Sequence, residues 1–377
     1  MSVPMMLLHA SVRWLEFLGL TTLLGGLAFR FLVIRPTLLS CEEFDSFERR
    51  RRRIEAGAIA LVALTSAGDL VLRTLVMSGG TVRTLGSAIP VVLRQTHYGI
   101  VWLVRIGLIG LLATAWVLGR RGGQSLDWSA RISLFGATLV ALTTTLSGHA
   151  ADWGDVTVPV LSDWLHSLVT GTWIGGLFAF GFVLSPSRQG GPGQSVAAMA
   201  PRFSRVAAGG ASIFILTGLY NAWVQVASFM PLVTTKYGWT LSVKLFLVGA
   251  ALLTAAANRF YFVPLLAYRP DGQGQPPLTW LGRVAGTLLK RKGSLDRERT
   301  SRQFIRSIRF EWLAAVGVLA CTALLTQLPP ARHIRSHQHR EEHVLHQPMH
   351  GRAMEKWSLL GKQSGSEFPL DRARRSW

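Results

Sequence analysis

Eight strongly apolar stretches lie between Leu7 and Leu328, and all but the last are about 20 residues long. A helix rises about 1.5 Å per residue, so a stretch of this length crosses the hydrocarbon core of a bilayer. The pattern predicts an all-α polytopic membrane protein, a bundle of about eight transmembrane helices. We place the spans near residues 10–34, 55–77, 97–118, 132–150, 163–184, 206–227, 239–262 and 311–328.

Lysine and arginine are unevenly distributed over the loops between these spans. The chain has a formal net charge of +20, a value that by itself suggests a nucleic-acid partner. The loops after spans 1, 3, 5 and 7 hold 7, 3, 3 and 11 basic residues, whereas those after spans 2, 4 and 6 hold 2, 0 and 1. Because cytoplasmic loops are enriched in Lys and Arg, the odd-numbered loops are predicted to be cytoplasmic and both termini extracytoplasmic, N-out and C-out. We therefore expect the run Arg49–Arg53 to fix the topology and contact anionic lipid, with no nucleic-acid partner.

Motifs of several common enzyme classes are absent from the sequence. It contains no Walker A, GxSxG or HExxH pattern, and its two cysteines, Cys41 and Cys321, form neither CxxC nor CxxCH. Cys41 falls in a predicted cytoplasmic loop and Cys321 inside the last span, so we expect no disulfide between them. We predict that the protein is not an enzyme, and that any transport is driven by a gradient or by exchange with a partner.

Four histidines fall at the ends of predicted spans, and the charge pattern places all four ends on the extracytoplasmic side. Imidazole nitrogen is a ligand for copper, zinc and haem iron, so several histidines at one end indicate a metal site. Methionines just before the first span would favour Cu(I). The loop between spans 4 and 5 has three Asp and no basic residue, which would attract cations to this end. The residues concerned are His9, His97, His149 and His166, with Met5 and Met6 as auxiliary ligands.

Charged side chains also lie inside the predicted spans. Glu16 shares one helical stripe with His9 and Arg13, and Asp69 lies one turn before Arg73. A charge at bilayer depth costs about 2.5 to 3.5 kcal/mol unless it is paired or hydrated. Such groups therefore form structural ion pairs or line a wet cavity, with Glu16 and Asp69 as auxiliary metal ligands in the second case. Arg105, deeper in span 3, should be neutralised by Asp69 or Glu16.

Several local motifs follow one another in a specific order along the bundle. They are THYGIVW from Thr96, SGHA from Ser147, His166 followed by WIGGL from Trp173, TGLYNAW from Thr217, Tyr237-Gly238 with Lys244, Asn258-Arg259, and Glu311. In these motifs the chain resembles the copper resistance protein D (CopD) family of bacterial inner-membrane proteins.

The resemblance implies copper handling at the inner membrane, usually uptake into the cytoplasm, often with a periplasmic copper-binding CopC-like partner. His149 and His166 match the family pattern and are the ligands it implies. In span 1 the chain has Glu16 where many relatives have a histidine, and His9 is a replacement ligand that the sequence offers.

The segment 329–377 forms a second predicted unit after the eight-helix domain 1–328. It is expected to be an extracytoplasmic, disordered tail that carries the other six histidines. His339, His343, His346 and His350 are spaced 4, 3 and 4 residues apart, which on a helix makes one imidazole stripe for Cu(II) or Zn(II). The alternative is a polar tail that captures no metal.

The sequence therefore predicts a copper-binding transporter with an outward-facing histidine site. Opposed histidines at matched depth can also ligate b-type haem between helices, and a membrane redox protein is the alternative. A structural or sensory subunit without cargo is a third class.

Overall fold

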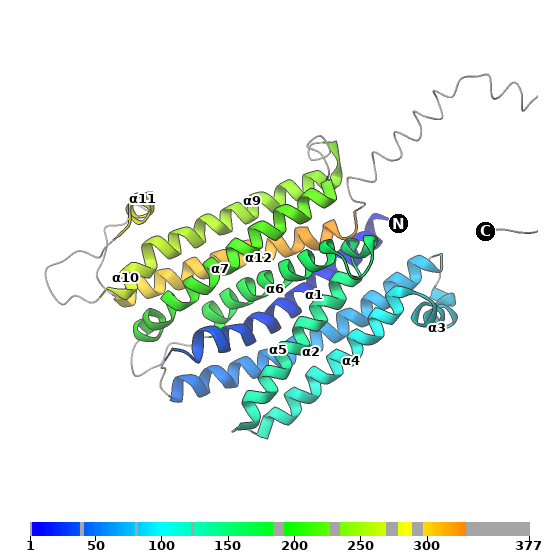
Figure 1. Cartoon of the computed structure of the whole chain (residues 1–377), viewed down its shortest axis with the longest axis horizontal. Coiled ribbons are helices and arrows are strands. Elements are labelled where there is room, and N and C mark those ends of the chain that lie inside the picture. The colour runs from blue at the N-terminus through cyan, green and yellow to red at the C-terminus, as the bar shows by residue number, and fades with distance from the viewer. Residues whose placement is uncertain are drawn as a thin grey trace, which may run out of the picture. The chain divides into compact units, whose positions relative to one another are not determined.

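The computed structural model of the chain describes residues 2–37, 41–79, 82–121, 124–183, 192–226, 234–268, 278–288 and 297–328. All regular secondary structure in these ranges is helical. Eight helices are long and apolar enough to cross a membrane, which confirms the eight predicted spans (Figure 1). They cover Val3–Ile34, Cys41–Met77, His97–Leu118, Asp127–Leu146, Val158–Val183, Ser195–Val224, Lys236–Ala267 and Glu298–Leu325.

These spans are built from helices joined by short π-helical and 3-10 turns. The long helices are α1 (Val3–Phe29), α2 (Cys41–Met77), α4 (His97–Leu118), α5 (Gln124–Leu146), α6 (Val158–Phe178), α7 (Pro192–Val226), α9 (Lys236–Ala257) and α12 (Arg297–Leu325). Single π-helical turns extend α1 as η1 (Arg30–Ile34), α6 as η5 (Ala179–Val183) and α9 as η6 (Asn258–Phe262), the last followed by α10 (Val263–Ala267). Several helices are one to four turns longer than the apolar stretches alone predicted.

Helix α1 is the centre of the bundle and packs against α2, α5, α6 and α12. Its contact with α6 is a backbone contact, because glycines face each other there. A Cβ atom on Gly175 would lie 1.9 Å from the carbonyl oxygen of Thr21, and one on Gly25 would lie 2.2 Å from the Cα of Gly175. Small residues allow transmembrane helices this close an approach. The Gly25–Gly175 contact therefore fixes which faces of α1 and α6 meet.

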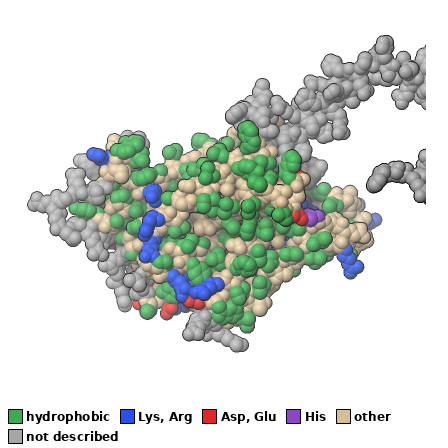
Figure 2. All heavy atoms as spheres, viewed as in Figure 1, with side chains coloured by type: hydrophobic (Ala, Val, Ile, Leu, Met, Phe, Trp, Pro, Cys, Tyr) green, Lys and Arg blue, Asp and Glu red, His purple; other side chains and the backbone are tan. Residues whose placement is uncertain are grey.

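Tryptophan indoles connect neighbouring helices through hydrogen bonds to main-chain oxygens. Trp14 of α1 donates to Val316 of α12 at 3.2 Å, and Trp102 of α4 donates to Ser66 of α2 at 2.9 Å. Trp164 of α6 donates to Thr138 of α5 at 2.9 Å. These bonds add fixed points between helices whose remaining contacts are mostly apolar. The outward faces carry large exposed apolar residues such as Trp223, and Figure 2 shows an apolar surface around the middle of the bundle, as lipid contact requires.

Two short amphipathic helices were not predicted. Helix α3 (Leu85–Gln95) precedes α4 and packs against it, where a Cβ on Gly99 would lie 2.1 Å from the carbonyl oxygen of Val92. Helix α11 (Trp280–Leu288) lies against η6. Both segments are too short to cross a bilayer.

The basic run Arg49–Arg53 lies inside α2, and part of it is bound within the bundle. Arg51 is 4% exposed and pairs with Glu48 at 2.9 Å and Glu55 at 2.7 Å. Arg52 donates to the carbonyl oxygens of Trp116 and Gly119, both at 2.7 Å. Arg49, Arg50 and Arg53 are exposed. Only those three side chains are therefore available for the predicted contact with anionic lipid, which stays a prediction.

Candidate functional site

All four predicted histidines lie at the end of the bundle where α1, α4 and α6 begin, hereafter the histidine end; Figure 1 shows where these helices begin. A cavity of about 590 Å³ opens among α1, α5, α6, α7, α9 and α12, and His149 and His166 both line it. His9 and His97 do not line it. Among the described residues, no three His, Cys, Asp or Glu side chains converge closely enough to hold a metal ion. The structure thus brings two of the four histidines to one cavity, and the role of each as a ligand stays a prediction.

His166 lies two turns into α6 with a defined ring orientation. Its Nδ1 is 3.0 Å from Thr217 Oγ1, and its ring stacks on Phe214 with the centroids 4.6 Å apart. The Thr217 hydroxyl also lies 2.7 Å from the carbonyl oxygen of Ile213, to which it donates its hydrogen. The Thr217 oxygen is then left to accept a hydrogen bond from Nδ1–H of the neutral ring.

This tautomer leaves the lone pair on Nε2 of His166. In the described part of the chain no hydrogen bond involves Nε2. Gly218 makes room for the ring, since a Cβ there would lie 3.2 Å from Cε1 of His166. In metal-binding histidines the ring nitrogen that does not bind the metal typically makes a hydrogen bond of this kind, which fixes the tautomer and the orientation of the ring.

His149 lies beyond the end of α5 in the 3-10 turn η4 (His149–Trp153), and not within a span as the sequence predicted. Its side chain is 36% exposed, with Nδ1 3.6 Å from Asp152 Oδ2. His149 is thus the more solvent-accessible of the two cavity histidines. Because a 3-10 turn presents side chains differently from a helix, the periodicity of span 4 could not place it.

His97 and His9 lie apart from the cavity. His97 begins α4 with an exposed ring, and its Nε2 is 2.9 Å from Oδ2 of Asp155, a residue in the connection before α6. His9 is 5% exposed, and its Nε2 has no hydrogen-bond partner among the described residues. Met5 and Met6 are half-buried at the start of α1 and do not line the cavity either.

The cavity also has a charged lining that the site prediction did not include. Asp163 Oδ1 is 3.4 Å from the amide nitrogen of Asn221, and Lys244 projects from α9 into the same cavity. Asp163 and Lys244 interact electrostatically, but the described residues offer Lys244 neither an ion pair within 4.0 Å nor a hydrogen bond. The signal in the sequence was that both charges fall inside apolar spans, where charged side chains commonly have functional roles.

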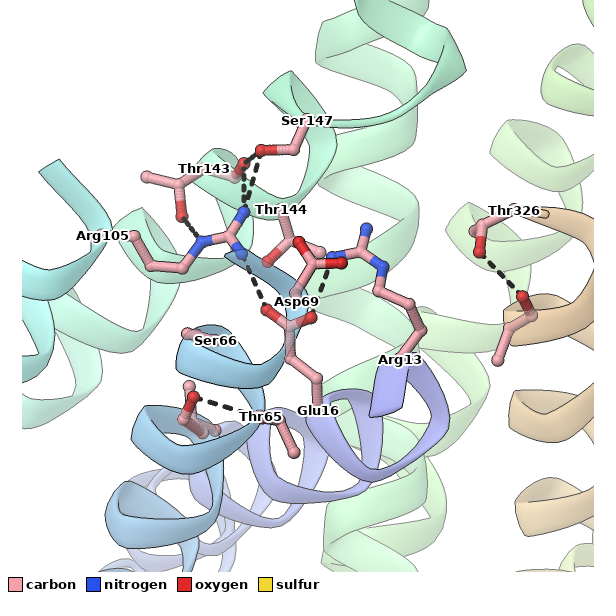
Figure 3. A network of polar contacts seen from close by, with 12 residues as sticks. Arg13, Glu16, Thr65, Ser66, Asp69, Arg105, Thr143, Thr144, Ser147 and Thr326 are labelled. Atoms are coloured by element: carbon pink, nitrogen blue, oxygen red, sulfur yellow. Dashed lines mark hydrogen bonds and ion pairs between the residues drawn. The ribbon is translucent and has the colours of Figure 1, made fainter. Parts of the chain in front are cut away.

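A network of paired charges adjoins the cavity, which its member Arg13 also lines (Figure 3). Glu16, with no exposed surface, bridges Arg13 at 2.8 Å and Arg105 at 3.0 Å. Arg105 also donates to Thr143 Oγ1 at 3.0 Å and to Ser147 Oγ at 2.9 Å. Of the two carboxylates expected to neutralise Arg105, the structure thus selects Glu16.

Asp69 belongs to a neighbouring set of contacts. It accepts a hydrogen bond from Tyr98 at 2.7 Å and pairs with Arg73 at 3.2 Å. Both carboxylates expected as auxiliary ligands, Glu16 and Asp69, are therefore engaged with arginines in this state. The other auxiliary residues, His339, His343, His346 and His350, lie outside the described residues, as does the rest of the predicted tail.

Comparisons with known proteins agree with this architecture. Residues 5–158 match the model of the copper resistance protein D-like N-terminal domain, and residues 197–325 match that of copper resistance protein D. The chain is 29% identical over 295 residues to copper transport protein CutJ of Bacillus subtilis (strain 168), which covers 76% of this chain and 47% of CutJ. It is 32% identical over 218 residues to copper resistance protein D of Pseudomonas syringae pv. tomato, covering 55% of this chain and 68% of that protein.

The chain thus spans about half the length of the first relative and two thirds of the second. No solved structure matches it. The two family models together cover most of the helical bundle, on both sides of the cavity. The chain belongs to the copper resistance protein D family of multi-pass membrane proteins.

Proposed function

We propose that this protein binds copper in the cavity at the histidine end and carries it across the bacterial inner membrane into the cytoplasm. The observation that carries the proposal is the geometry of His166, whose Nδ1 is held by Thr217 while Nε2 is left for a ligand in the cavity. His149, at a more exposed position on the same cavity, is the second ligand. The names of the relatives supply copper as the cargo.

The charges that line the cavity suit a site that is filled and emptied. The carboxylate of Asp163 attracts a cation. When no cargo is present, the positive charge of Lys244 balances the negative charge of Asp163. An arriving copper ion competes with Lys244 for the field of Asp163. Because the Lys244 ammonium forms no close ion pair with a described residue, copper can bind without breaking a buried ion pair.

The remaining predictions define how cargo reaches the site in this proposal. The charge distribution over the loops puts the histidine end and both termini on the extracytoplasmic side. The histidines of the segment 329–377 would collect copper there, and a soluble CopC-like protein would deliver it. Neither the described histidines nor the names of the relatives favour the b-type haem alternative, which we do not carry forward.

Copper stoichiometry of the purified protein tests the proposal. His166→Ala and His149→Ala should each reduce the copper bound per chain. His97→Ala is the matched control, because His97 lies at the same end but does not line the cavity. Equal copper in all three variants and the wild type would contradict the cavity site.

Topology reporters test the direction of entry. Reporters fused at Gly191 or Gly274 should report cytoplasm and one fused after Leu360 should report periplasm. The opposite pattern would reverse the proposed direction of entry.

A further inference from the structure

Glu311 is a buried carboxyl group inside the bundle that does not line the cavity. It lies in α12 (Arg297–Leu325), where the charged first half of the helix, which ends with Arg309, gives way to the last apolar stretch. Its residue exposure is 2% and it does not line the cavity. The candidate site therefore assigns it no role.

Two neutral donors hold this carboxyl group. Trp173 of α6 donates from Nε1 to Oε1 at 2.9 Å, and Asn258 of η6 donates from Nδ2 to Oε2 at 2.9 Å. No Lys, Arg or His in the described part of the chain lies within ion-pair distance of it. By contrast, the buried carboxylates Glu16, Glu48, Glu55 and Asp69 each pair with an arginine.

The charged groups on the elements packed around Glu311 are directed elsewhere. Arg309 of α12 donates to the carbonyl oxygen of Gly181, and Arg259 of η6 donates to Ser204. On α6, His166 precedes Trp173 by seven residues, about 10 Å of helix, and on α9, Lys244 precedes Asn258 by 14 residues, about 21 Å. On α1, Arg13 and Glu16 bond each other, and on α7 neither Arg202 nor Arg205 forms an ion pair with Glu311. Among the described residues an ionised Glu311 would thus have no ion-pair partner, and an isolated buried charge is unfavourable by several kcal/mol.

Asn258 provides the second observation. The residue is 5% exposed, and its buried Oδ1 has no hydrogen-bond partner among the described residues. Buried amide oxygens are nearly always bonded. A half-turn of the amide would exchange Nδ2 for Oδ1 opposite the carboxyl group, and the two orientations are nearly indistinguishable by shape.

The two amide orientations suit two protonation states. With Nδ2 toward Glu311, Asn258 donates to a carboxylate. With Oδ1 toward Glu311, it accepts the hydrogen of a neutral carboxylic acid. We propose that Glu311 and Asn258 form a proton-binding site inside the bundle, in which the amide of Asn258 turns as the carboxyl group gains or loses its proton.

This site has a packed connection to the cavity. Trp173, which bonds Glu311, contacts Phe214 with ring centroids 5.5 Å apart, and Phe214 stacks on His166 at 4.6 Å. A ligand that moves the His166 ring would displace Phe214, and with it the indole that bonds Glu311. Proton exchange at Glu311 would in this way accompany cargo binding, a role that rests on the proposed copper function, whereas the proton site itself does not.

Infrared difference spectroscopy on the full-length protein in lipid vesicles tests the site. A step from mildly alkaline to mildly acidic buffer should produce the carbonyl band of a newly protonated carboxyl group in the wild type. Glu311→Gln should lose that band and still fold, because a glutamine amide imitates the neutral acid toward Asn258. Asp163→Asn, which removes a carboxyl group of the cavity, should keep it.

A band that persists in Glu311→Gln, or no such band in the wild type, would overturn the proposal. If Glu311→Gln does not fold, Asn258→Ala serves in its place and should shift the pH at which the band appears; an unchanged titration would also overturn the proposal. Copper bound per chain, measured on the same samples without a pH step, reports the proposed function separately. If the wild type shows the Glu311 band but binds no copper, the proposed copper site alone would be refuted.

Discussion

The two sides of the bundle treat charge in opposite ways. Among α1, α2, α4 and α5, buried charges are closed into ion pairs, such as Glu16 with Arg13 and Arg105 and, at the opposite end, Arg30 with Glu48 and Asp127. Among α6, α7, α9 and α12, the described buried charges are not paired in this way: Lys244 faces the cavity and Glu311 has only neutral donors.

This difference suggests that the helices with paired charges form a rigid scaffold, and that the helices with unpaired charges bind cargo and protons. A closed ion pair in a low-dielectric interior is costly to open, because removing one partner leaves an uncompensated charge. The paired side should therefore keep one arrangement throughout a transport cycle. The unpaired charges can respond to a cation or a proton without such a cost, so changes in charge should be confined to the side formed by α6, α7, α9 and α12.

The largest effect is expected where the comparison is sharpest. Glu16→Ala leaves the buried guanidinium groups of Arg13 and Arg105 without their shared carboxylate, and should lower the free energy of unfolding by about 3–5 kcal/mol. Folded yield in detergent and the melting temperature measure it. Asp163→Asn is the control on the other side, and equal losses for the two variants would remove the distinction between the sides.

The junction between the two sides should be nearly as sensitive. Gly175→Ala places a Cβ atom 1.9 Å from the main-chain oxygen of Thr21, which cannot move without shifting α1, and should cost about 1–3 kcal/mol. Gly249→Ala, also in a membrane helix but with nothing within 4 Å of the added atom, is the matched control and should keep the melting temperature of the wild type. A loss in Gly249→Ala as large as in Gly175→Ala would show that glycine flexibility matters more than helix contact.

The next effect separates Asp69 from its neighbours. Asp69→Ala should cost about 1–3 kcal/mol, because the Tyr98 hydroxyl loses its acceptor while Arg73, 31% exposed, can turn to water. Adding Arg73→Met should recover part of this loss, whereas adding Arg105→Met should not, since Arg105 pairs with Glu16. Melting temperatures of the singles and doubles give the coupling energies. Recovery with Arg105→Met and not with Arg73→Met would show that the pairing in the structure is wrong.

Hydropathy alone was sufficient to predict the eight spans, because the bilayer requires a stretch of about 20 apolar residues for each crossing. It was also sufficient to bring the four histidines to one end, since an even number of crossings separates their positions. The rotation of each helix about its axis was not predictable in the same way. It depends on contacts such as Gly25 with Gly175, and this rotation decides that His166 faces the cavity while His9 faces away from it.

The unpaired charges were missed for a related reason. Arg105 was expected to find Asp69 or Glu16 because a buried cation needs a counter-charge, and that requirement narrowed the choice to two residues. Glu311 has no counter-charge among the described residues, so no such requirement could identify its partners. Its two donors come from α6 and η6, 138 and 53 residues away in the sequence. Only the packing of α12 against both brings them together.

The smallest effect on stability, and the most informative about function, is expected for Lys244. Because the described residues give its ammonium no ion pair within 4.0 Å and no hydrogen bond, Lys244→Met removes only the longer-range attraction to Asp163 and should change the free energy of unfolding by less than about 0.5 kcal/mol. The same change removes a positive charge that opposes Asp163 in the cavity, so copper should bind more tightly, by the Coulomb repulsion that is lost. Titration of the purified protein with copper under reducing conditions measures the affinity, and Lys244→Arg, which keeps the charge, is the control.

A marked loss of stability in Lys244→Met would place Lys244 with the structural charges of α1, α2, α4 and α5. Unchanged affinity in a stable variant would mean that copper does not enter the field of Asp163, and the cavity could then not be the site that His166 serves.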